Sequence, residues 1–364
     1  MKIAFFGSSL LSAYWNGAAT YYRGILAALH ARGHAITFYE PDAFERQQHR
    51  DIDPPEYAAV VVYPAGSPDD ALNALDQARH ADVIVKASGV GVYDALLESA
   101  VLSLKTPHNL IAFWDVDAPA TLDRVQADAA DPFRALIPRY DVILTYGGGG
   151  LVETTYKRLG ARLVVPIYNA VDPATHHPVA PDPAFAVDLA FIGNRLPDRE
   201  ARVENFFLGA AALMPGATFL LGGSGWGDKP MPANVRYIGH VYTRDHNAIN
   251  GSARAVLNIN RDSMAAYGFS PPTRVFEVAG AGGCLISDAW MGIETFLTPG
   301  DEMLTAAHGG EVAALLAGLS PDRARAIGAA ARRRVLAEHT YAHRAAQVEI
   351  ALEGMAALRL AGGR

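Results

Sequence analysis

Residues 270–288 read SPPTRVFEVAGAGGCLISD and combine a helix start, a turn of small residues and a short apolar strand. Ser270 and the two prolines after it are typical of a helix N-terminus, because the fixed φ of proline suits the first helical turn. The pattern predicts a helix over Thr273–Gly280, which the small residues that follow allow to pack closely on the next element. Cys284–Ser287 is then expected to form a strand that ends at Asp288.

The predicted helix offers an anion site and a diol site one turn apart. Its opening, with Ser270 and Thr273, presents unpaired N–H groups and a partial positive charge to an anion. Arg274 in the first turn can donate two hydrogen bonds to a phosphate. Glu277 lies one turn further on, where its carboxylate can accept both hydroxyls of a ribose. We expect these four residues to bind a nucleotide, although Ser-Pro helix starts with a buried glutamate also occur in α/β proteins without such a ligand.

This stretch resembles the nucleotide-binding helix of glycosyltransferases with the GT-B fold, most closely the CgeB-like (spore-maturation) group. The large retaining GT-B families have two glutamates eight positions apart here. Glu277 matches the second, which holds the ribose, and Phe269 stands in place of the first. The resemblance implies a nucleotide-sugar site, and Phe269 allows a donor other than the common hexoses. The pattern of the group, roughly S-P-S-x-R-x-F-E-x-x-A-x-G, is matched by Ser270, Pro271, Arg274, Phe276, Glu277, Ala279 or Ala281, and Gly282.

Composition narrows the class of protein. A chain of 364 residues, 50% of them hydrophobic, predicts about two domains with a core each. The formal net charge of -7 argues against a nucleic-acid partner, which would favour a basic face. The single cysteine, Cys284, excludes an intrachain disulfide and a cysteine metal cluster. The apolar run after Lys2 is too short for a secretory signal, and Pro215 interrupts the longest uncharged stretch. We therefore expect a cytoplasmic protein without an integral membrane segment.

Short apolar segments alternate with helical ones along the chain, which is the rhythm of doubly wound parallel α/β sheets. Ligands in such sheets bind outside the carboxyl ends of the strands. The expected strands are Lys2–Gly7, Ala35–Tyr39, Tyr57–Tyr63, Ala81–Lys86, Asn109–Trp114, Tyr140–Thr145 and Arg162–Pro166 in the first half, and Asp188–Ile192, Thr218–Gly222, Val235–Ile238, Ala255–Asn260 and Cys284–Ser287 in the second.

A segment rich in proline, asparagine and histidine separates the two halves and is typical of a hinge. Its phrase N-x-V-D-x-x-x-H-x-P, from Asn169 to Pro178, is similar to the crossing between domains in GT-B proteins. We interpret His176 and His177 as polar hinge residues, because no further metal ligand lies near them in sequence. The expected organisation is a Rossmann-like acceptor-side domain over 1–168, a linker over 169–187, a Rossmann-like nucleotide-sugar-binding domain over 188–340 that faces the first across a cleft, and a helix over 341–364 that returns to the first domain.

The loop after the first strand argues against a nicotinamide cofactor. Gly7 is followed by no second glycine until Gly17, so the G-x-G-x-x-G pattern is missing, although Glu40 at the end of the second strand is placed to hold a ribose. The segment Trp15–Ala19 and the long helix after it instead resemble the glycine loop of GT-B transferases. The resemblance implies that Gly17 lets the backbone approach the phosphate or the sugar of the donor.

Asp115 and Asp117 follow a predicted strand as a D-V-D motif. A D-x-D pair grips a divalent ion in the other glycosyltransferase fold, but this one is far along the chain from the expected nucleotide helix, so we expect no metal site. Two roles stay open. A carboxylate at the strand end can orient or deprotonate an acceptor hydroxyl, or the pair can cap the helix predicted over Ala118–Ala127. CgeB-like sequences have a similar W-D-x-D segment, which favours the catalytic role.

The loop after the first strand of the second half, Gly193-Asn194-Arg195, resembles the diphosphate loop of GT-B proteins. The resemblance implies that Arg195, or Arg199 in the next helix, stabilises the diphosphate leaving group, although either arginine can instead pair with a nearby carboxylate. Tyr267 in the loop 261–269 can stack on the base of the donor or pack internally. The run Arg332–Arg334 can attract an anionic membrane by peripheral contact, although a solvated helix face is the commoner explanation of such runs.

These patterns predict a glycosyltransferase that moves a sugar from a UDP-, GDP- or dTDP-linked donor to a hydroxyl of a glycan, lipid-linked sugar, protein or small molecule, with no metal or other cofactor. The resembling families mostly retain the anomeric configuration, whereas an inverting enzyme would need one of the two aspartates as general base. Two alternatives stay open: a nucleotide-sugar epimerase of the same fold, and a non-catalytic protein that binds a nucleotide or a sugar. Assembly as a homodimer is also left open.

Overall fold

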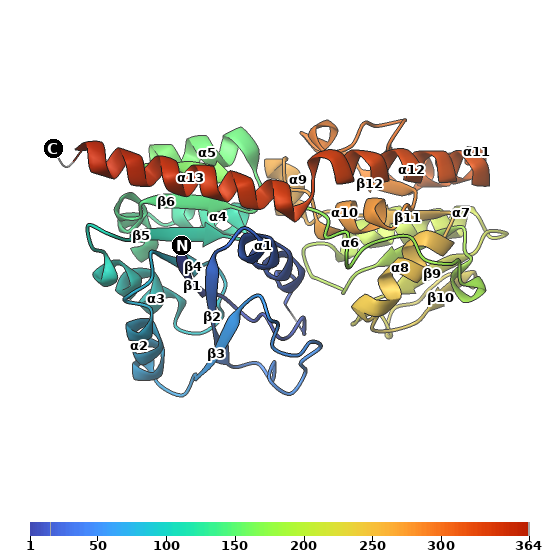
Figure 1. The fold of residues 1–364 in the computed structure, drawn as a ribbon. Helices are drawn as coiled ribbons and strands as arrows, with labels where there is room; N and C mark the ends of the chain where they lie inside the picture. The colour runs from blue at the N-terminus through green and yellow to red at the C-terminus, as the bar shows by residue number, and fades with distance from the viewer. Residues whose placement is uncertain (15, 363–364) are drawn as a thin grey trace. The chain divides into compact units, whose positions relative to one another are not determined.

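The computed structural model describes residues 1–14 and 16–362, so Trp15 of the expected glycine loop lies outside the described residues. The chain forms two compact units (Figure 1). Unit 1 consists of residues 1–169 and the last helix, α13 (Tyr341–Gly362), and unit 2 is Ala170–Thr340. Each unit contains one parallel sheet, which confirms the predicted fold class of two Rossmann-like α/β domains.

The sheet of unit 1 has the strand order β3-β2-β1-β4-β5-β6-β7 and is parallel throughout. Strands β4 and β5 are buried along their whole length, as their continuous apolar runs predict. The strands are β1 (Lys2–Phe6), β2 (Ala35–Asp42), β3 (Ala59–Pro64), β4 (Val83–Ala87), β5 (Leu110–Asp115), β6 (Val142–Thr145) and β7 (Val164–Pro166). The helices are α1 (Ala19–Ala31), α2 (Pro68–Gln77), α3 (Asp94–Ala100), α4 (Ala118–Ala127) and α5 (Gly149–Arg158), with short turns η1 (Val101–Leu104), η2 (Pro132–Ala135) and η3 (Ile137–Arg139).

Aromatic side chains form the centre of the core of unit 1. The ring of Phe5 packs on Tyr22, Phe38 and Trp114, with ring centroids 5.3, 5.4 and 5.5 Å away. The hydroxyl of Tyr21 accepts a hydrogen bond from Nε1 of Trp114 at 3.0 Å and donates one to the carbonyl of Ile167 at 2.7 Å. These buried polar atoms are therefore paired, and they link α1 to the chain that leaves β7.

The sheet of unit 2 has the order β10-β9-β8-β11-β12-β13 and is also parallel. Its core includes Phe191, Phe207 and Trp226, all fully buried. The strands are β8 (Leu189–Ile192), β9 (Phe219–Gly222), β10 (Val235–Tyr237), β11 (Ala255–Asn258), β12 (Leu285–Asp288) and β13 (Leu304–Ala306). The helices are α6 (Glu200–Val203), η5 (Glu204–Leu208), α7 (Gly209–Leu213), α8 (Thr243–Ser252), α9 (Asp262–Tyr267), α10 (Thr273–Gly280), α11 (Gly309–Gly318) and α12 (Pro321–Glu338), with short turns η4 (Pro183–Phe185) and η6 (Ile293–Thr295).

The twelve predicted strands are all present, and the helix at the centre of the prediction, α10, has the predicted bounds. The helix α11 was not predicted, and two shorter elements also differ from the prediction. The segment 261–269, expected as a loop, contains α9, and the short edge strand β13 was not predicted. Both are short, so neither shows enough periodicity in the sequence to be distinguished from a loop.

The last helix, α13, packs against α1 and β6 within unit 1 (Figure 1). Glu349 of α13 accepts hydrogen bonds from Arg32 at 2.6 Å and from Nε2 of His34 at 2.8 Å. At the start of the helix the buried ring of Tyr341 lies against Gly24 of α1, where a Cβ atom would be 2.2 Å from the ring. The absence of a side chain at Gly24 therefore allows the two helices to pack.

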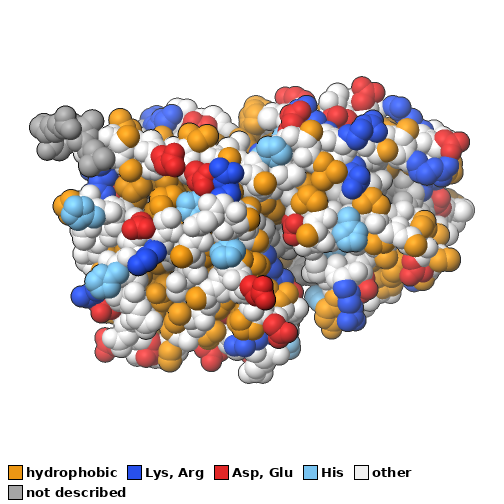
Figure 2. Space-filling view, viewed as in Figure 1, with side chains coloured by type: hydrophobic (Ala, Val, Ile, Leu, Met, Phe, Trp, Pro, Cys, Tyr) orange, Lys and Arg blue, Asp and Glu red, His pale blue; other side chains and the backbone are white. Residues whose placement is uncertain are grey.

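The surface is mixed in charge. On the face that Figure 2 shows, acidic and basic side chains are interspersed over both units. No helix within residues 1–14 and 16–362 combines the length and the apolar character that crossing a bilayer requires.

We predict that Gly24→Ala destabilises the protein. The added methyl group would overlap the Tyr341 ring, and overpacking of this kind costs about 1–3 kcal/mol, which outweighs the roughly 1 kcal/mol that alanine gains over glycine in a helix. Thermal unfolding should show a lower Tm. Gly354→Ala in α13 is the matched control, since nothing lies within 4 Å of its added atom, and its Tm should not fall. Equal Tm values for the two variants would contradict the described packing of α1 on α13.

Candidate functional site

The strand order of unit 2 reverses between β8 and β11, and ligands of open α/β sheets bind at such switch points. Arg274, in the first turn of α10, connects the ends of these two strands. It donates one hydrogen bond to the carbonyl of Ile192 and another to Oδ1 of Asn258, the second at 3.1 Å. The arginine that the sequence predicts to bind an anion is therefore fixed at the switch point of the sheet.

A second guanidinium group lies next to that of Arg274. Arg199 directly precedes α6, and the two guanidinium groups lie over the buried ring of Phe191, 5.7 Å from its centroid for Arg199 and 5.0 Å for Arg274. Arg199 donates to the carbonyl of Asn194 at 2.6 Å and forms no ion pair with a carboxylate in the described part of the chain. Burial, followed by repulsion from Arg274, lowers the pKa of Arg199 to about 9. Two adjacent guanidinium groups on one ring attract a polyanion.

The backbone between the two guanidinium groups belongs to Gly193. A Cβ atom there would lie 3.0 Å from Nη2 of Arg199 and 3.0 Å from Nη2 of Arg274. Other parts of unit 2 hold this loop in place. Nε1 of Trp226 donates to the carbonyl of Gly193 at 2.8 Å, and the N–H of Ser224 donates to the side chain of Asn194 at 2.9 Å. A glycine at 193 therefore leaves the space beside both guanidinium groups open.

Arg195, the other arginine predicted to stabilise the leaving group, has two carboxylate partners. It donates to both oxygens of Glu200, at 2.7 and 2.9 Å, and to Asp228 at 2.8 Å. These hydrogen bonds, that to Glu200 first, raise the pKa of Arg195. The ion pair with Glu200 is the alternative that the sequence left open. The charge of Arg195 is thus already balanced, and Arg199 is the better candidate for contact with an anion.

Glu277 lies one turn after Thr273 on α10, with a side chain 12% exposed. Its carboxylate is 3.8 Å from Nδ1 of His246 in α8, and His176, from the segment after β7, lies in the same cluster. Burial alone would raise the pKa of Glu277, but the charges of the two histidines and of Arg274, with a hydrogen bond from Thr273, outweigh it and lower the pKa. The carboxylate is therefore kept ionised, as an acceptor of ribose hydroxyls must be.

Sequence reasoning missed His246 and interpreted His176 as an isolated hinge residue. The structure instead places His176 beside His246 and Glu277. These three residues come from distant parts of the chain, and no spacing in the sequence relates them. Only the packing of α8 and of the segment after β7 against α10 brings them together.

The residues just before α10 differ from the prediction. α10 begins at Thr273 as predicted, and its N-cap is Pro272, so Ser270 lies before the cap. Ser270 is buried, and its hydroxyl donates to the carbonyl of Gly268 at 2.9 Å. Tyr267 is the last residue of α9 and is partly exposed. Phe269 has a left-handed backbone with φ 45°, and Gly292 leaves room for its ring. Ser270 therefore shapes the loop, and Tyr267 stays a candidate for stacking on a base.

In unit 1, Asp115 at the end of β5 is enclosed by hydrogen-bond donors and is 0% exposed. One carboxylate oxygen accepts from Ser88 at 2.8 Å and from Thr121 at 3.0 Å, and the other accepts from the hydroxyl of Tyr156 at 2.5 Å. Burial raises the pKa of Asp115, and the hydrogen bonds from Tyr156 and Ser88 offset part of this effect. A carboxyl group enclosed in this way supports the surrounding loops, and its contact with a substrate stays a prediction.

Asp117 is the partly exposed member of the D-V-D motif. It occupies the N-cap position of α4, but its side chain makes no capping hydrogen bond, so the capping alternative is wrong for it. Its backbone N–H donates to Asp115 at 3.1 Å. The structure thus separates the pair into an inner carboxylate that holds the backbone and an outer one that remains a candidate for contact with an acceptor.

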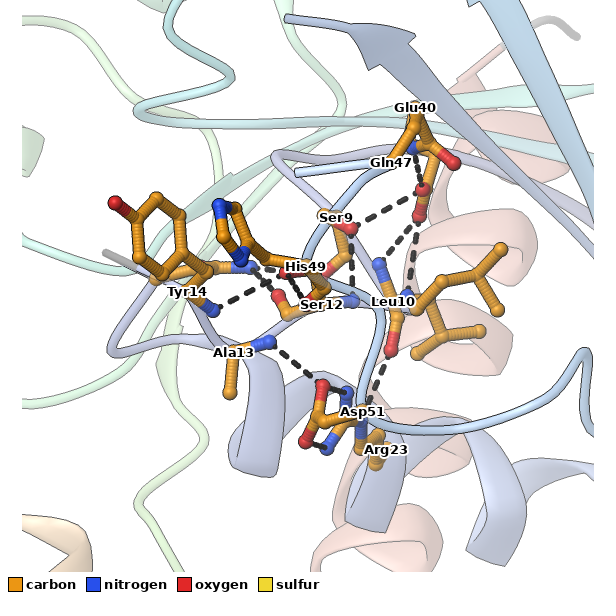
Figure 3. A network of polar contacts seen from close by, with 12 residues as sticks. Ser9, Leu10, Ser12, Ala13, Tyr14, Arg23, Glu40, Gln47, His49 and Asp51 are labelled. Carbon is orange, nitrogen blue, oxygen red and sulfur yellow. Dashed lines mark hydrogen bonds and ion pairs between the residues drawn. The ribbon is translucent and has the colours of Figure 1, made fainter. Parts of the chain in front are cut away.

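The loop between β1 and α1 is anchored by Glu40 at the end of β2 (Figure 3). The buried carboxylate accepts hydrogen bonds from the N–H of Leu10 at 2.6 Å, from the hydroxyl of Ser9 at 3.1 Å and from the amide of Gln47 at 2.6 Å. Both of its oxygens are therefore occupied within unit 1. Glu40 cannot hold a ribose as well, which agrees with the missing G-x-G-x-x-G pattern.

Gly17 lies near the end of the same loop and is exposed. A Cβ atom there would meet nothing within 4 Å, so the packing of unit 1 does not require a glycine. Elsewhere the loop is fixed by Asp51, which accepts from the N–H of Ala13 at 2.9 Å and pairs with Arg23 (Figure 3). The approach of a donor at Gly17 stays a prediction.

The comparisons with known proteins point to one fold. Residues 199–350, which include Arg199, Arg274 and Glu277, match the protein family described as Glycosyl transferase-like. Sucrose-phosphate synthase from Thermosynechococcus elongatus has a similar structure, with a TM-score of 0.70 and 15% identity over 98% of this chain and 100% of that one. The chain has the GT-B fold.

Two further GT-B structures are similar over nearly the whole chain. HepE from Anabaena, in complex with UDP and glucose, gives a TM-score of 0.69 at 13% identity, covering 97% of this chain and 100% of that one. BGT from T4 phage, in complex with its UDP-glucose substrate, gives 0.58 at 12% identity, covering 97% and 99%. No curated protein matches the sequence. At these identities the comparison establishes the fold, and the site itself must indicate the function.

We predict that Arg199→Met raises the stability of the ligand-free protein. The folded-state pKa of Arg199 lies below its unfolded value, so the protonated side chain costs the folded state free energy at neutral pH, where both states are charged. Its removal should stabilise the protein by on the order of 1 kcal/mol. The same variant should lose the rise in Tm that inorganic pyrophosphate gives the wild type.

Arg202→Met is the matched control for this prediction. Arg202 pairs with the buried carboxylate of Asp288 at 2.5 Å, so its loss should lower the Tm. An Arg199→Met protein that is less stable than the wild type would show that Arg199 supports the fold and is not held ready for an anion.

Proposed function

We propose that this protein is a glycosyltransferase that moves a sugar from a UDP-linked donor to an acceptor hydroxyl, with the nucleotide sugar bound by unit 2 and the acceptor by unit 1. One observation carries the proposal: Arg199 and Arg274 lie together at the ends of β8 and β11, and the ionised Glu277 follows one turn along α10. The two arginines suit a diphosphate, and the carboxylate suits the diol of a ribose.

The arginines act on the leaving group. Transfer breaks the bond between the anomeric carbon of the sugar and the diphosphate, and negative charge accumulates on the departing UDP. Arg199 and Arg274 stabilise this charge, and because both are fixed in advance by hydrogen bonds and by the Phe191 ring, no reorganisation is needed when the bond breaks. Gly193 leaves room for the phosphate oxygens between them.

We also propose that transfer needs no divalent cation. Two guanidinium groups bring to the diphosphate the positive charge that a magnesium ion would otherwise supply. Retention of configuration is proposed from the resemblance to the retaining GT-B families, and assignment to the CgeB-like group from the match over Ser270–Gly282. The choice of uridine is supported by the UDP and UDP-glucose bound to the similar structures.

Asp117 is the residue that we assign to the acceptor hydroxyl. It is partly exposed, whereas Asp115 is enclosed and holds the backbone of Asp117. In a retaining reaction Asp117 orients the hydroxyl. In an inverting reaction it would also remove the proton.

The proposed function is tested first by thermal shift with UDP, GDP, dTDP and NAD, in the presence of EDTA. A ligand at 100 times its Kd raises the free energy of unfolding by about 2.7 kcal/mol, and we expect UDP to give the largest shift without metal.

Turnover of UDP-glucose is then followed with and without hydroxyl acceptors. Acceptor-dependent release of UDP supports a transferase. A changed sugar without acceptor would indicate an epimerase, and stabilisation by NAD alone would contradict the proposal.

We predict that Glu277→Gln weakens the binding of UDP by about 10- to 100-fold, because a neutral amide is a poorer acceptor for the two ribose hydroxyls and removal of a charged partner costs about 1.5–3 kcal/mol. Isothermal titration calorimetry in EDTA measures this change. Glu294→Gln, on the exposed surface of the same unit, is the control and should bind UDP like the wild type. Equal affinity in the two variants would exclude Glu277 from the nucleotide site.

We predict that Asp117→Asn reduces kcat while the Kd for UDP is unchanged. A loss of about 100-fold is expected for an inverting reaction, in which Asp117 removes the proton, and a smaller loss for a retaining one, in which it orients the hydroxyl. Asp115→Asn should instead lower the Tm, because its amide cannot accept all the hydrogen bonds of the buried carboxylate, a loss of about 1–3 kcal/mol. Steady-state kinetics measures the loss of kcat in Asp117→Asn, and thermal unfolding measures the fall of Tm in Asp115→Asn. Full activity in Asp117→Asn would return the D-V-D motif to a purely structural role.

A further inference from the structure

His176, His246 and Glu277 bring three metal-ligating side chains together within unit 2. One ring nitrogen of each histidine and one carboxylate oxygen lie within 4.8 Å of one another, and Nδ1 of His246 is 3.8 Å from an oxygen of Glu277. His176 comes from the segment after β7, His246 from α8 and Glu277 from α10. Among the described residues, this group has the donor types of a metal site, with donor atoms close enough to converge on one ion.

One nitrogen of the buried His176 ring has no hydrogen-bond partner among the described residues. The residue is 3% exposed, and its Nε2 makes no hydrogen bond within the described structure. A buried polar atom without a partner costs about 1–3 kcal/mol. The same holds for other buried atoms of the described residues, so the unpaired nitrogen adds to the argument only together with the nearby imidazole and carboxylate.

The backbone around His176 is built to hold the ring in place. Asp172 accepts hydrogen bonds from the N–H of Ala174 at 3.0 Å and from the hydroxyl of Thr175 at 2.6 Å. The side chain of Asn247 in α8 donates to the carbonyl of Thr175 at 2.8 Å. On the other side Gly280 of α10 allows close approach, because a Cβ atom there would lie 2.9 Å from the carbonyl oxygen of His176. The three segments are therefore fixed to one another by contacts that do not involve the cluster itself.

We propose that His176, His246 and Glu277 bind a divalent transition-metal ion of the zinc class. Two imidazoles and one carboxylate are a set that zinc uses in proteins, with a fourth position left for water. Magnesium prefers oxygen ligands, so the cluster would not recruit the ion that commonly accompanies a diphosphate. Zinc–nitrogen bonds of about 2.0–2.1 Å require the donor atoms to move closer together. The side chains of Glu277 and His246, 12% and 19% exposed, would make that movement on ion binding.

The ion would inhibit the protein. Glu277 is the carboxylate that we assign to the ribose, so an ion and a nucleotide would compete for it. This consequence rests on the proposed function, whereas binding of the ion does not. Zinc would then inhibit nucleotide binding, and excess nucleotide or a chelator would reverse the inhibition.

The test uses the full chain without a histidine tag, treated with a chelator and dialysed. Co²⁺ is titrated as a spectroscopic probe, and Zn²⁺ binding is measured by calorimetry. We expect the visible ligand-field bands of four-coordinate Co²⁺, displaced by one equivalent of Zn²⁺. His246→Gln should weaken Zn²⁺ by more than the roughly 10- to 100-fold that loss of an outer partner costs. His177→Gln is the matched control, since His177 is exposed and adjacent to His176, and it should leave the affinity unchanged. Absence of the Co²⁺ bands, or equal Zn²⁺ affinity in the two variants, would overturn the proposal.

A second measurement separates this proposal from the proposed function. The thermal shift given by UDP is recorded with EDTA and with a slight excess of Zn²⁺, and we expect the Zn²⁺ to reduce it in the wild type but not in His246→Gln. A shift with EDTA that Zn²⁺ does not change would overturn the inhibitory role and leave the UDP site intact. No shift with EDTA, together with the expected Co²⁺ bands, would instead overturn the proposed function and leave the metal site standing.

Discussion

The hydrogen bonds of Arg274 to the ends of β8 and β11 fix the N-terminus of α10 against the sheet of unit 2. Because Arg274 lies in the first helical turn, these bonds also set the place of Glu277 one turn later. The same guanidinium lies over Phe191 and repels that of Arg199, which is held nearby by the carbonyl of Asn194. The fold thus maintains an unfavourable concentration of positive charge, and its packing must offset that cost.

Buried carboxylates at strand ends recur in both units. Near the end of β2, Glu40 accepts a hydrogen bond from the loop after β1. Asp115 at the end of β5 accepts one from the backbone of the loop that follows it. Asp288 at the end of β12 accepts one from the N–H of Asn260 at 3.2 Å. Taking a carboxylate out of water is costly, and the loop donors compensate for it. Each of these residues fixes a loop at the carboxyl ends of the parallel strands, where ligands of such sheets bind. In the sequence, however, an acidic residue after an apolar strand indicates catalysis and loop support equally well.

This ambiguity explains how far the sequence predicts the site. The bounds of α10 and the positions of the strands along the chain follow from apolar runs, prolines and glycines, which act locally. The sequence also shows directly that Arg274 lies in the first turn of this helix and that Glu277 lies one turn later. The second partner of Arg195 is not local, because Asp228 lies in the loop after β9. The enclosure of Asp115 by Ser88, Thr121 and Tyr156 is not local either. Which charged side chain is already paired, and which is accessible to a ligand, depends on neighbours that are distant in sequence. The spacing of residues along the chain does not show these neighbours.

The return of α13 to unit 1 makes that unit discontinuous, with Arg32 and Glu349 in contact across 317 positions of sequence. Closing so long a loop is entropically costly while the intervening chain is unfolded. Within unit 2, however, Val171 and Thr340 pair as a parallel bridge, and the N–H of Val171 donates to the carbonyl of His339 at 2.8 Å. Once unit 2 has folded, its first and last residues are neighbours, and the loop that α13 must close shrinks to a few residues. Folding of unit 2 therefore lowers the entropic cost of bringing the last helix back to unit 1.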